Sequence, residues 1–299
     1  MTGGEGGDIL LLMRNFRCAA LAAASLVFAA IPASAQSSIE ELRPVTNWNL
    51  DYAEDSCGLS RNFGSADAPV TLLMRQYAPG APLALTVVGR RTMRANLDAE
   101  VHFGPGDNGN ARLMTAIELQ LENGLNGVQA QTYAPSDNPV GADASAQWIA
   151  VSGVFDGDIR LETGSLQPAF NALEECQYSL LEYWGLDAEA HRSLQQRANM
   201  RTGDEWVGTA LLRMPDSAAN AARNSTQWML FFVGADGDIT ACRALSPNTF
   251  EQFATHFCAM AVERGSAIPA VSAQGEAIAS VLSFGLDVRT SAEPFYTDN

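Results

Sequence analysis

The sequence contains no lysine, so all 18 of its basic residues are arginine. Without lysine, the chain cannot form a P-loop with its phosphate-binding lysine, a Schiff base or a Ser-Lys catalytic dyad. Acidic residues outnumber basic ones by 34 to 18, which gives a formal net charge of −16. Such a charge repels nucleic acid, so we expect a solvated acidic surface and no nucleic-acid partner.

Patterns that usually mark catalytic or metal sites are also missing. The three histidines, His102, His191 and His256, are far apart in the sequence and lack the close spacing of metal ligands. The chain has no Cys-x-x-Cys pair and no Gly-x-Ser-x-Gly sequence. We therefore predict no catalytic residue, no metal and no cofactor.

Two acidic patterns have a simpler interpretation than chemistry. Glu174 and Glu175 are adjacent, as acid–base pairs can be, but carboxylates are common on helix surfaces and no nucleophile accompanies them. The Asp-Gly-Asp sequences at 156–158 and 236–238 lack the further oxygen ligands of a calcium loop. We interpret them as turns.

The N-terminal residues have the pattern of a secretory signal. Arg14 and Arg17 precede a short apolar run, and Ala33-Ser34-Ala35 matches a cleavage site. The run is shorter than the ~20 residues that a membrane-spanning helix needs. We expect a signal peptide over 1–35, cleaved after Ala35, with translation starting at Met13 rather than Met1. The mature product is then expected to be soluble and periplasmic, with no membrane span.

The next region has the pattern of a β-rich domain. Short apolar runs alternate with Gly, Pro, Asn and Asp turn residues, without βαβ alternation. The predicted strands are Trp48–Tyr52, Val70–Tyr77, Leu83–Val88, Ala99–Phe103, Leu113–Leu121, Gly127–Tyr133, Trp148–Phe155 and Ile159–Glu162. Ser165 is the predicted cap of a helix over Leu166–Trp184, which has one apolar face. We predict an α+β protein whose β-rich N-terminal domain, 36–186, is an antiparallel sheet, sandwich or barrel closed by this long helix.

Residues 187–206 are polar and nearly free of core-type side chains, so we predict a connector to a C-terminal domain over 207–299. That domain has the pattern of a small β-α-β unit. Its predicted elements are a helix after Pro215, a hairpin of Trp228–Val233 and Ile239–Cys242 joined by Asp236-Gly237, a helix from Thr249, and a closing strand, Ala277–Val288.

This order and spacing resemble the C-terminal domain of the TonB family, in the variant that carries one cysteine at the end of the second strand and one on the following helix. Met214 replaces the family's tyrosine before the proline, and Ala267 replaces an aromatic residue before Pro269. The resemblance implies a domain that binds peptides of outer-membrane transporters by strand addition. Separately, Asn47–Gly64 and Tyr183–Asp187 resemble an N-terminal module of exported α-proteobacterial proteins, which implies no activity.

Four cysteines follow the signal peptide, and three pairings are possible. In an exported chain we expect disulfides, with buried free thiols as the alternative. The resemblance pairs Cys242 with Cys258. We pair Cys57, in the predicted loop after the first strand, with Cys176 on the long helix, so that each domain holds its own bridge.

We expect the closing strand to lie at a sheet edge and to bind a partner through Ala277, Ala279, Val281, Ser283 and Gly285. The predicted function is non-enzymatic binding of a cell-envelope protein or peptide, an outer-membrane transporter being the partner that the resemblance implies. The chain is not expected to transduce energy, because it lacks a membrane anchor and a Pro-rich spacer. The alternatives are a hydrolase-type enzyme with its site in the N-terminal β domain, and a structural or envelope-stress protein. The sequence predicts no oligomeric state.

Overall fold

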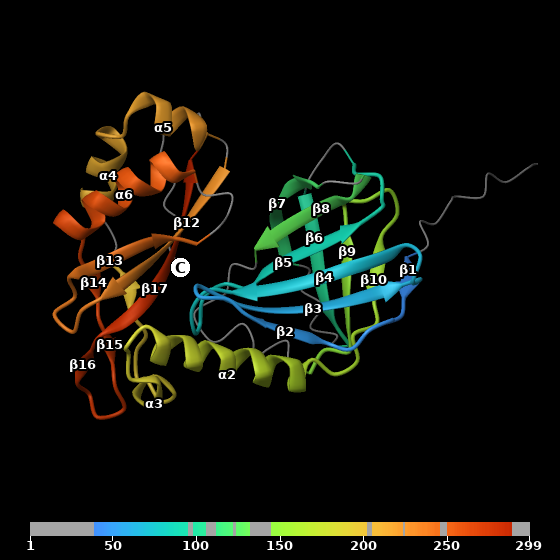
Figure 1. Ribbon diagram of the computed structural model, residues 1–299, viewed down its shortest axis with the longest axis horizontal. Helices are drawn as coiled ribbons and strands as arrows, with labels where there is room; N and C mark the ends of the chain where they lie inside the picture. Colours follow the sequence, from blue (N-terminus) through green and yellow to red (C-terminus); the bar gives the residue numbers. More distant parts are fainter. Residues whose placement is uncertain are drawn as a thin grey trace, which may run out of the picture. The chain divides into compact units, whose positions relative to one another are not determined.

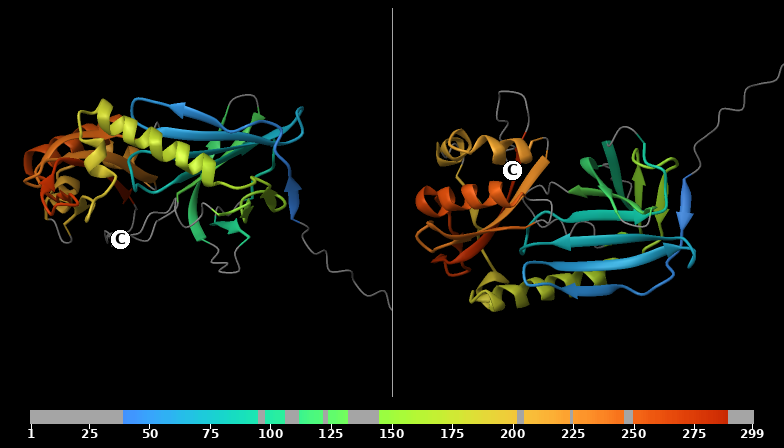
Figure 2. Two further views of the ribbon diagram at one scale, coloured as in Figure 1. Left: turned by 90° about the horizontal axis from the view of Figure 1, so that it is seen from below. Right: turned by 45° about the horizontal axis from the view of Figure 1, so that its top comes forward.

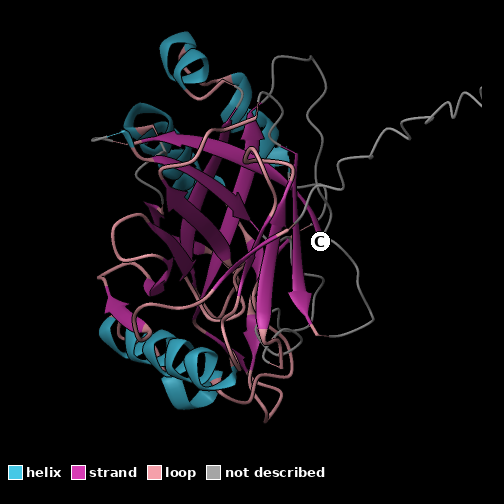
Figure 3. Cartoon of the chain, turned by 90° about the vertical axis from the view of Figure 1, so that its right-hand side faces the viewer, coloured by secondary structure: helices cyan, strands magenta, loops and turns pink. Residues whose placement is uncertain are grey.

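The computed structural model describes residues 39–94, 98–105, 112–121, 124–131, 145–201, 205–223, 225–245 and 250–288 (Figure 1). It mixes helices and strands, with strand the larger share (Figure 3). The predicted signal peptide, its cleavage site and the alternative start at Met13 lie outside the described residues. Within these residues no helix combines the length and apolarity needed to cross a bilayer.

Most strands belong to one large, mainly antiparallel sheet. They are β1 (Glu40–Leu42), β2 (Asn49–Tyr52), β3 (Cys57–Gly64), β4 (Pro69–Gln76), β5 (Ala84–Gly89), β6 (Asp98–Gly104), β7 (Arg112–Gln120), β8 (Asn126–Gln131), β9 (Trp148–Ser152) and β10 (Ile159–Leu161). Their order is β1-β10-β9-β6-β7-β8-β5-β4-β3-β2, and only β1 and β10 are parallel. Each strand predicted in this region overlaps an observed one.

The segment after β1 draws the two ends of this sheet together. While β1 pairs with β10, Pro44 forms a bridge with Phe63 of β3. The amide of Gly64 also donates to the carbonyl of Arg43 at 2.8 Å. The sheet therefore rolls back toward itself around a core that includes Leu42, Phe63 and Phe155. We call this junction of β1 with β3 the seam.

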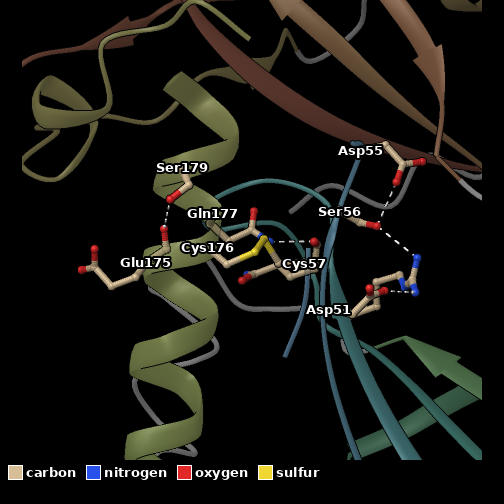
Figure 4. Close-up of a disulfide and its surroundings, with 10 residues drawn as sticks. Asp51, Asp55, Ser56, Cys57, Glu175, Cys176, Gln177 and Ser179 are labelled. Carbon is tan, nitrogen blue, oxygen red and sulfur yellow. Dashed lines mark hydrogen bonds and ion pairs between the residues drawn. A yellow bond between two sulfur atoms is a disulfide. The ribbon is translucent and has the colours of Figure 1, made fainter. Parts of the chain in front are cut away.

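Helix α2 (Gln167–Tyr183) packs its apolar face onto β2 and β3 (Figure 2). Phe170, Leu173 and Cys176 on that face belong to the same core as the sheet. The Cys57–Cys176 disulfide joins α2 to the start of β3, and both cysteines are fully buried (Figure 4). Beside the bridge, the side-chain amide of Gln177 donates to the carbonyl of Gln76 at 2.7 Å. This predicted pairing is confirmed.

Two local predictions in this region are wrong. Cys57 begins strand β3 and does not lie in a loop. The residues between the inward-facing Cys57, Leu59 and Phe63 include Gly58, Ser60 and Asn62, which have weak strand preference. The sequence therefore did not show the alternating pattern of a strand here. Ser165 does not cap α2, because the helix begins one residue later, with Leu166 at the cap position and no side-chain capping bond.

The predicted connector over 187–206 contributes to the core, contrary to expectation. It forms α3 (Ala188–His191), β11 (Asn199–Met200) and the start of α4 (Glu205–Leu212). Ala188, His191 and Ala198 are buried. Strand β11 pairs with β14 (Ala267–Ile268), and this pairing with a distant segment explains why a polar stretch is ordered.

The C-terminal region contains a three-stranded antiparallel sheet covered on one face by helices. Its remaining elements are α5 (Asp216–Ala221), β12 (Ser225–Val233), β13 (Ile239–Ala244), α6 (Glu251–Arg264), β15 (Ala270–Val271), β16 (Ala277–Ile278) and β17 (Ser280–Val288). The sheet order is β13-β12-β17. Phe253 and Phe257 of α6 form a core with Phe231 of β12.

The predicted hairpin and helices of this region have counterparts in the structure. Gly237 turns the β12–β13 hairpin with φ +91°, a conformation that favours glycine. The helix expected from Thr249 is observed from Glu251, and Thr249 itself lies outside the described residues. The closing strand is interrupted, because Ala277 and Ile278 pair with β15 instead of β12.

The described residues all fall within one compact unit, Ser37–Asn299. Inside it, the β-rich region and the C-terminal region each have a hydrophobic core of their own. The division into two independently folding domains stays a prediction.

Candidate functional site

Strand β17 lies at one edge of the three-stranded sheet. It pairs with β12 over its whole length, from Ser280 opposite Val233 to Val288 opposite Ser225, without a bulge. Among the described strands, none pairs with its other side. Ser280–Leu286 contains neither a charged residue nor proline. Natural edge strands usually carry charges, prolines or bulges that prevent pairing, so β17 is an edge without the usual protection.

The register shows which backbone groups of β17 point outward. The amide of Leu245 donates to the carbonyl of Trp228, so the backbone groups of Trp228 face β13. In an antiparallel ladder this direction alternates from residue to residue. Met229 and Phe231 therefore turn their backbone groups toward β17, where they pair with Phe284 and Leu282.

The residues between those paired positions turn their amide and carbonyl groups away from β12. By this alternation they are Val281, Ser283, Gly285 and Asp287. A segment added to this edge would bond to these four residues, and the existing ladder would stay intact.

Of the five predicted binding residues, the structure places three on this edge. They are Val281, Ser283 and Gly285, which lie in β17 and turn their backbone amide and carbonyl groups away from β12. Ala277 pairs with Val271 in the separate β15–β16 sheet, and Ala279 lies between β16 and β17. These two do not line the edge, because the chain changes partner sheet at Ala279.

Both faces of the sheet are packed. Leu282, Phe284 and Leu286 lie on the face that meets α6, where the rings of Phe284 and Phe231 stack at 5.7 Å. On the opposite face, Trp228 and Leu230 pack with a group of side chains from the segment after β4, namely Tyr77, Ala78 and Ala81. This segment packs on the second face, and the edge of β17 has no pairing strand among the described residues.

The burial of Tyr77 shows that water is excluded from this part of the second face. Its side chain is buried beside Trp228, and burial raises the pKa of the Tyr77 hydroxyl above its ordinary value of 10.0. Val281 also packs beside Tyr178 and Leu181 of α2, so helix side chains flank its end of β17. Ser283 and Gly285 lie further along the strand.

Position 285 must be glycine because the indole ring of Trp228 lies directly opposite it. A Cβ atom at this position would lie 2.6 Å from the Trp228 ring, far inside van der Waals contact. The ring thus fills the space above the glycine, as aromatic residues often do across a sheet. A larger residue at this position would therefore require the ring or the strand to shift.

The Cys242–Cys258 disulfide joins β13 to α6, with Cα atoms 5.2 Å apart, and confirms the second predicted pairing. It closes a loop with a sequence separation of 16. Loop-closure entropy for such a loop is worth about 3 kcal/mol.

We expect the double substitution Cys242→Ala and Cys258→Ala to lower the free energy of unfolding by about 3 kcal/mol, because the unfolded chain gains freedom. Guanidinium unfolding followed by tryptophan fluorescence measures the change. The matched control is the chain with Cys57→Ala and Cys176→Ala, which keeps the Cys242–Cys258 bridge alone and should show a comparable loss on reduction. Equal midpoints for the variant and the oxidised chain would contradict a stabilising role for the bridge.

The described residues contain no cluster of His, Cys, Asp or Glu that could hold a metal. His191 is buried, with Nδ1 2.6 Å from the Asp187 carbonyl, and His256 contacts the carbonyl of Ala210 at 3.1 Å. Asp187 accepts a bond from the amide of Ala190 and caps α3. These contacts are those of structural residues.

The adjacent acidic residues of α2 are exposed and form polar contacts on the helix surface. Glu175 forms two 2.8 Å bonds with Arg192, whose guanidinium lies 4.1 Å from the Tyr178 ring centroid. Hydrogen bonding to Arg192, together with its charge, lowers the pKa of Glu175 below the ordinary 4.5. Glu174 accepts a bond from the Tyr178 hydroxyl.

A depressed folded pKa means that the Glu175 carboxylate stabilises the chain above pH 4.5 and loses this effect as the pH falls through the folded value. Glu175→Gln should therefore cost a small amount of stability at pH 7, and the cost should shrink below pH 4.5. Urea unfolding at a series of pH values measures it. Glu182→Gln on the same helix is the control, since Glu182 forms no ion pair with a described residue. A cost for Glu175→Gln that does not change with pH would contradict the assignment.

Comparison with known proteins identifies no relative: no family model matches the chain, and neither a curated protein nor a solved structure is similar to it. The resemblance to the TonB family therefore stays a prediction.

Proposed function

We propose that the chain is a periplasmic, non-enzymatic binding protein that captures an extended segment of a cell-envelope protein by strand addition to β17. The observation that carries the proposal is a bulge-free edge strand that has no charged residue from Ser280 to Leu286 and whose backbone groups at Val281, Ser283 and Gly285 point outward. In strand addition the backbone bonds provide affinity, and the side chains at alternate positions provide selectivity.

The packing on both faces supports this function. An edge strand binds well only when it is held in place, because a mobile strand must be ordered at the expense of affinity. The ring of Phe284 stacks on Phe231, and Trp228 covers Gly285, so β17 is held before a partner arrives. The resemblance to the TonB family adds the class of partner, a protein such as an outer-membrane transporter that presents an extended segment.

Photo-crosslinking in periplasmic extract tests this proposal. A benzoylphenylalanine residue in place of Ser283 should crosslink one envelope protein after irradiation. The control places the same residue at Arg213, an exposed site that lies outside β17. Crosslinking of the partner from both sites, or from neither, would contradict binding at this edge. A crosslink that forms only to a second copy of the chain would mean that β17 binds another copy of itself and not an envelope protein.

A further inference from the structure

A cavity of about 740 Å3 lies at the seam, away from β17. Segments from β1, the β3–β4 turn and the end of β5 meet there. The lining residues are Glu40, Glu41, Leu42, Arg43, Gly64, Ser65, Ala68, Val70, Arg90, Arg91, Thr92 and Asp156. The volume is within the range of sites for small ligands.

Three of the lining residues are arginines, in a chain that is strongly acidic overall. Arg91 is neutralised, because its guanidinium bonds to Glu40 at 2.6 Å. Glu41 contacts Arg160 at 2.8 Å, and the same guanidinium also binds Glu162 at 2.6 Å. Arg43 and Arg90 form no ion pair with any described residue. Two guanidinium groups of the lining therefore have no carboxylate partner among the described residues.

The backbone at the seam fixes the positions from which these side chains extend. The carbonyl of Arg43 accepts the amide of Gly64, and Arg90 directly follows the last residue of β5. The next carbonyl along the chain, that of Arg91, accepts the side-chain amide of Asn126 at 2.8 Å. Two arginine positions from distant parts of the sequence are thus fixed beside one cavity.

Hydroxyl groups add neutral donors to the same lining. The Ser65 hydroxyl accepts the amide of Ala68 at 3.2 Å, which leaves its own hydrogen free to donate. Thr92 supplies a second hydroxyl. The opposing charge is Asp156, a lining carboxylate that forms no ion pair with a described residue.

We propose that this cavity binds a small anion of the phosphate or carboxylate type, with Arg43 and Arg90 as its positive partners. The planar guanidinium group matches both anions, since it can donate two parallel hydrogen bonds to a pair of oxygens. Among the described residues, two lining arginines have no ion-pair partner against one such carboxylate, Asp156, and this local balance favours an anionic ligand. Arg90 and Arg91 are adjacent in the sequence, but Arg43 comes beside them through the fold.

Isothermal titration of the purified chain at low ionic strength tests the proposal, with inorganic phosphate, pyrophosphate and succinate as separate probes. The two phosphates and the dicarboxylate distinguish the two ligand types. We expect saturable one-site binding of at least one probe. The double variant Arg43→Gln and Arg90→Gln should weaken it at least tenfold, whereas Asp156→Asn should strengthen it, because it removes the opposing charge.

The matched control is the double variant Arg201→Gln and Arg213→Gln, which removes the same charge from two exposed arginines outside the cavity. It should bind the probe as the unsubstituted chain does. Failure of all three probes to bind, or equal weakening in the two double variants, would overturn the proposal. Because the cavity shares no residue with β17, neither outcome bears on the edge-strand function.

Discussion

Removal of the Cys57–Cys176 bridge is expected to lower the free energy of unfolding by about 5 kcal/mol, because the bridge closes a loop with a sequence separation of 119. Both cysteines are fully buried in the main core. The double substitution to alanine also leaves a small void where α2 meets β3. We therefore expect this variant to lose more stability than the one without Cys242–Cys258.

Guanidinium unfolding of the two double variants side by side measures the difference. Each serves as the control for the other, since both remove one bridge and add two alanines. Single substitution to serine at Cys57 should also leave Cys176 as a detectable free thiol after unfolding. A smaller loss for the Cys57–Cys176 variant than for the Cys242–Cys258 variant would contradict the loop-length argument.

The second large effect is expected from Ser283→Pro. Proline removes one backbone N–H, and at Ser283 this group points away from β12. The ladder to β12 therefore survives, while an added strand loses a hydrogen bond and meets the proline ring at the middle of the edge. We expect partner binding to fall at least a hundredfold, with the unfolding midpoint nearly unchanged.

Two matched variants make this test specific. Ser283→Ala keeps the N–H and should bind as the unsubstituted chain does. Leu282→Pro removes an N–H that faces β12 and should destabilise the sheet, which checks the assignment of directions. The amount of envelope protein captured from periplasmic extract by each folded variant measures binding. Equal capture by the proline and alanine variants at position 283 would place the partner elsewhere.

Local signals were sufficient to predict much of the C-terminal region. The Asp236-Gly237 pair has turn chemistry that works without distant contacts, and it does join β12 to β13. The apolar run from Trp228 to Val233 is buried on both sides, which favours a strand. The apolar face of α2 was predicted for the same reason, since a helix with such a face must pack it.

Elements that depend on distant partners could not be predicted in the same way. Strand β3 contains Gly58 and Asn62, and is held by its neighbours β2 and β4 on both sides. Strand β11 exists because it pairs with β14. Ala277 looked like part of one long strand, but it pairs with Val271 in another sheet. Strand propensity predicts poorly where pairing with a distant segment determines whether a strand forms.

The candidate site shows the same division. An apolar closing strand was visible in the sequence, and so were Val281, Ser283 and Gly285 as candidate residues. The direction of their backbone groups follows from the bond between Leu245 and Trp228, which is a property of the register and not of the composition. The cavity beside Arg43 and Arg90 likewise arises where the sheet rolls back on itself.

Amide hydrogen exchange resolved by NMR tests the central claim, that β17 is an open edge, most directly. In the free chain, the amides of Leu282, Phe284 and Leu286 should exchange slowly because they bond to β12, while those of Ser283 and Gly285 should exchange much faster. Addition of the captured partner should slow exchange at Ser283 and Gly285 and leave the other three amides unchanged. Slow exchange at Ser283 and Gly285 in the free chain, or no slowing when the partner binds, would contradict strand addition at β17.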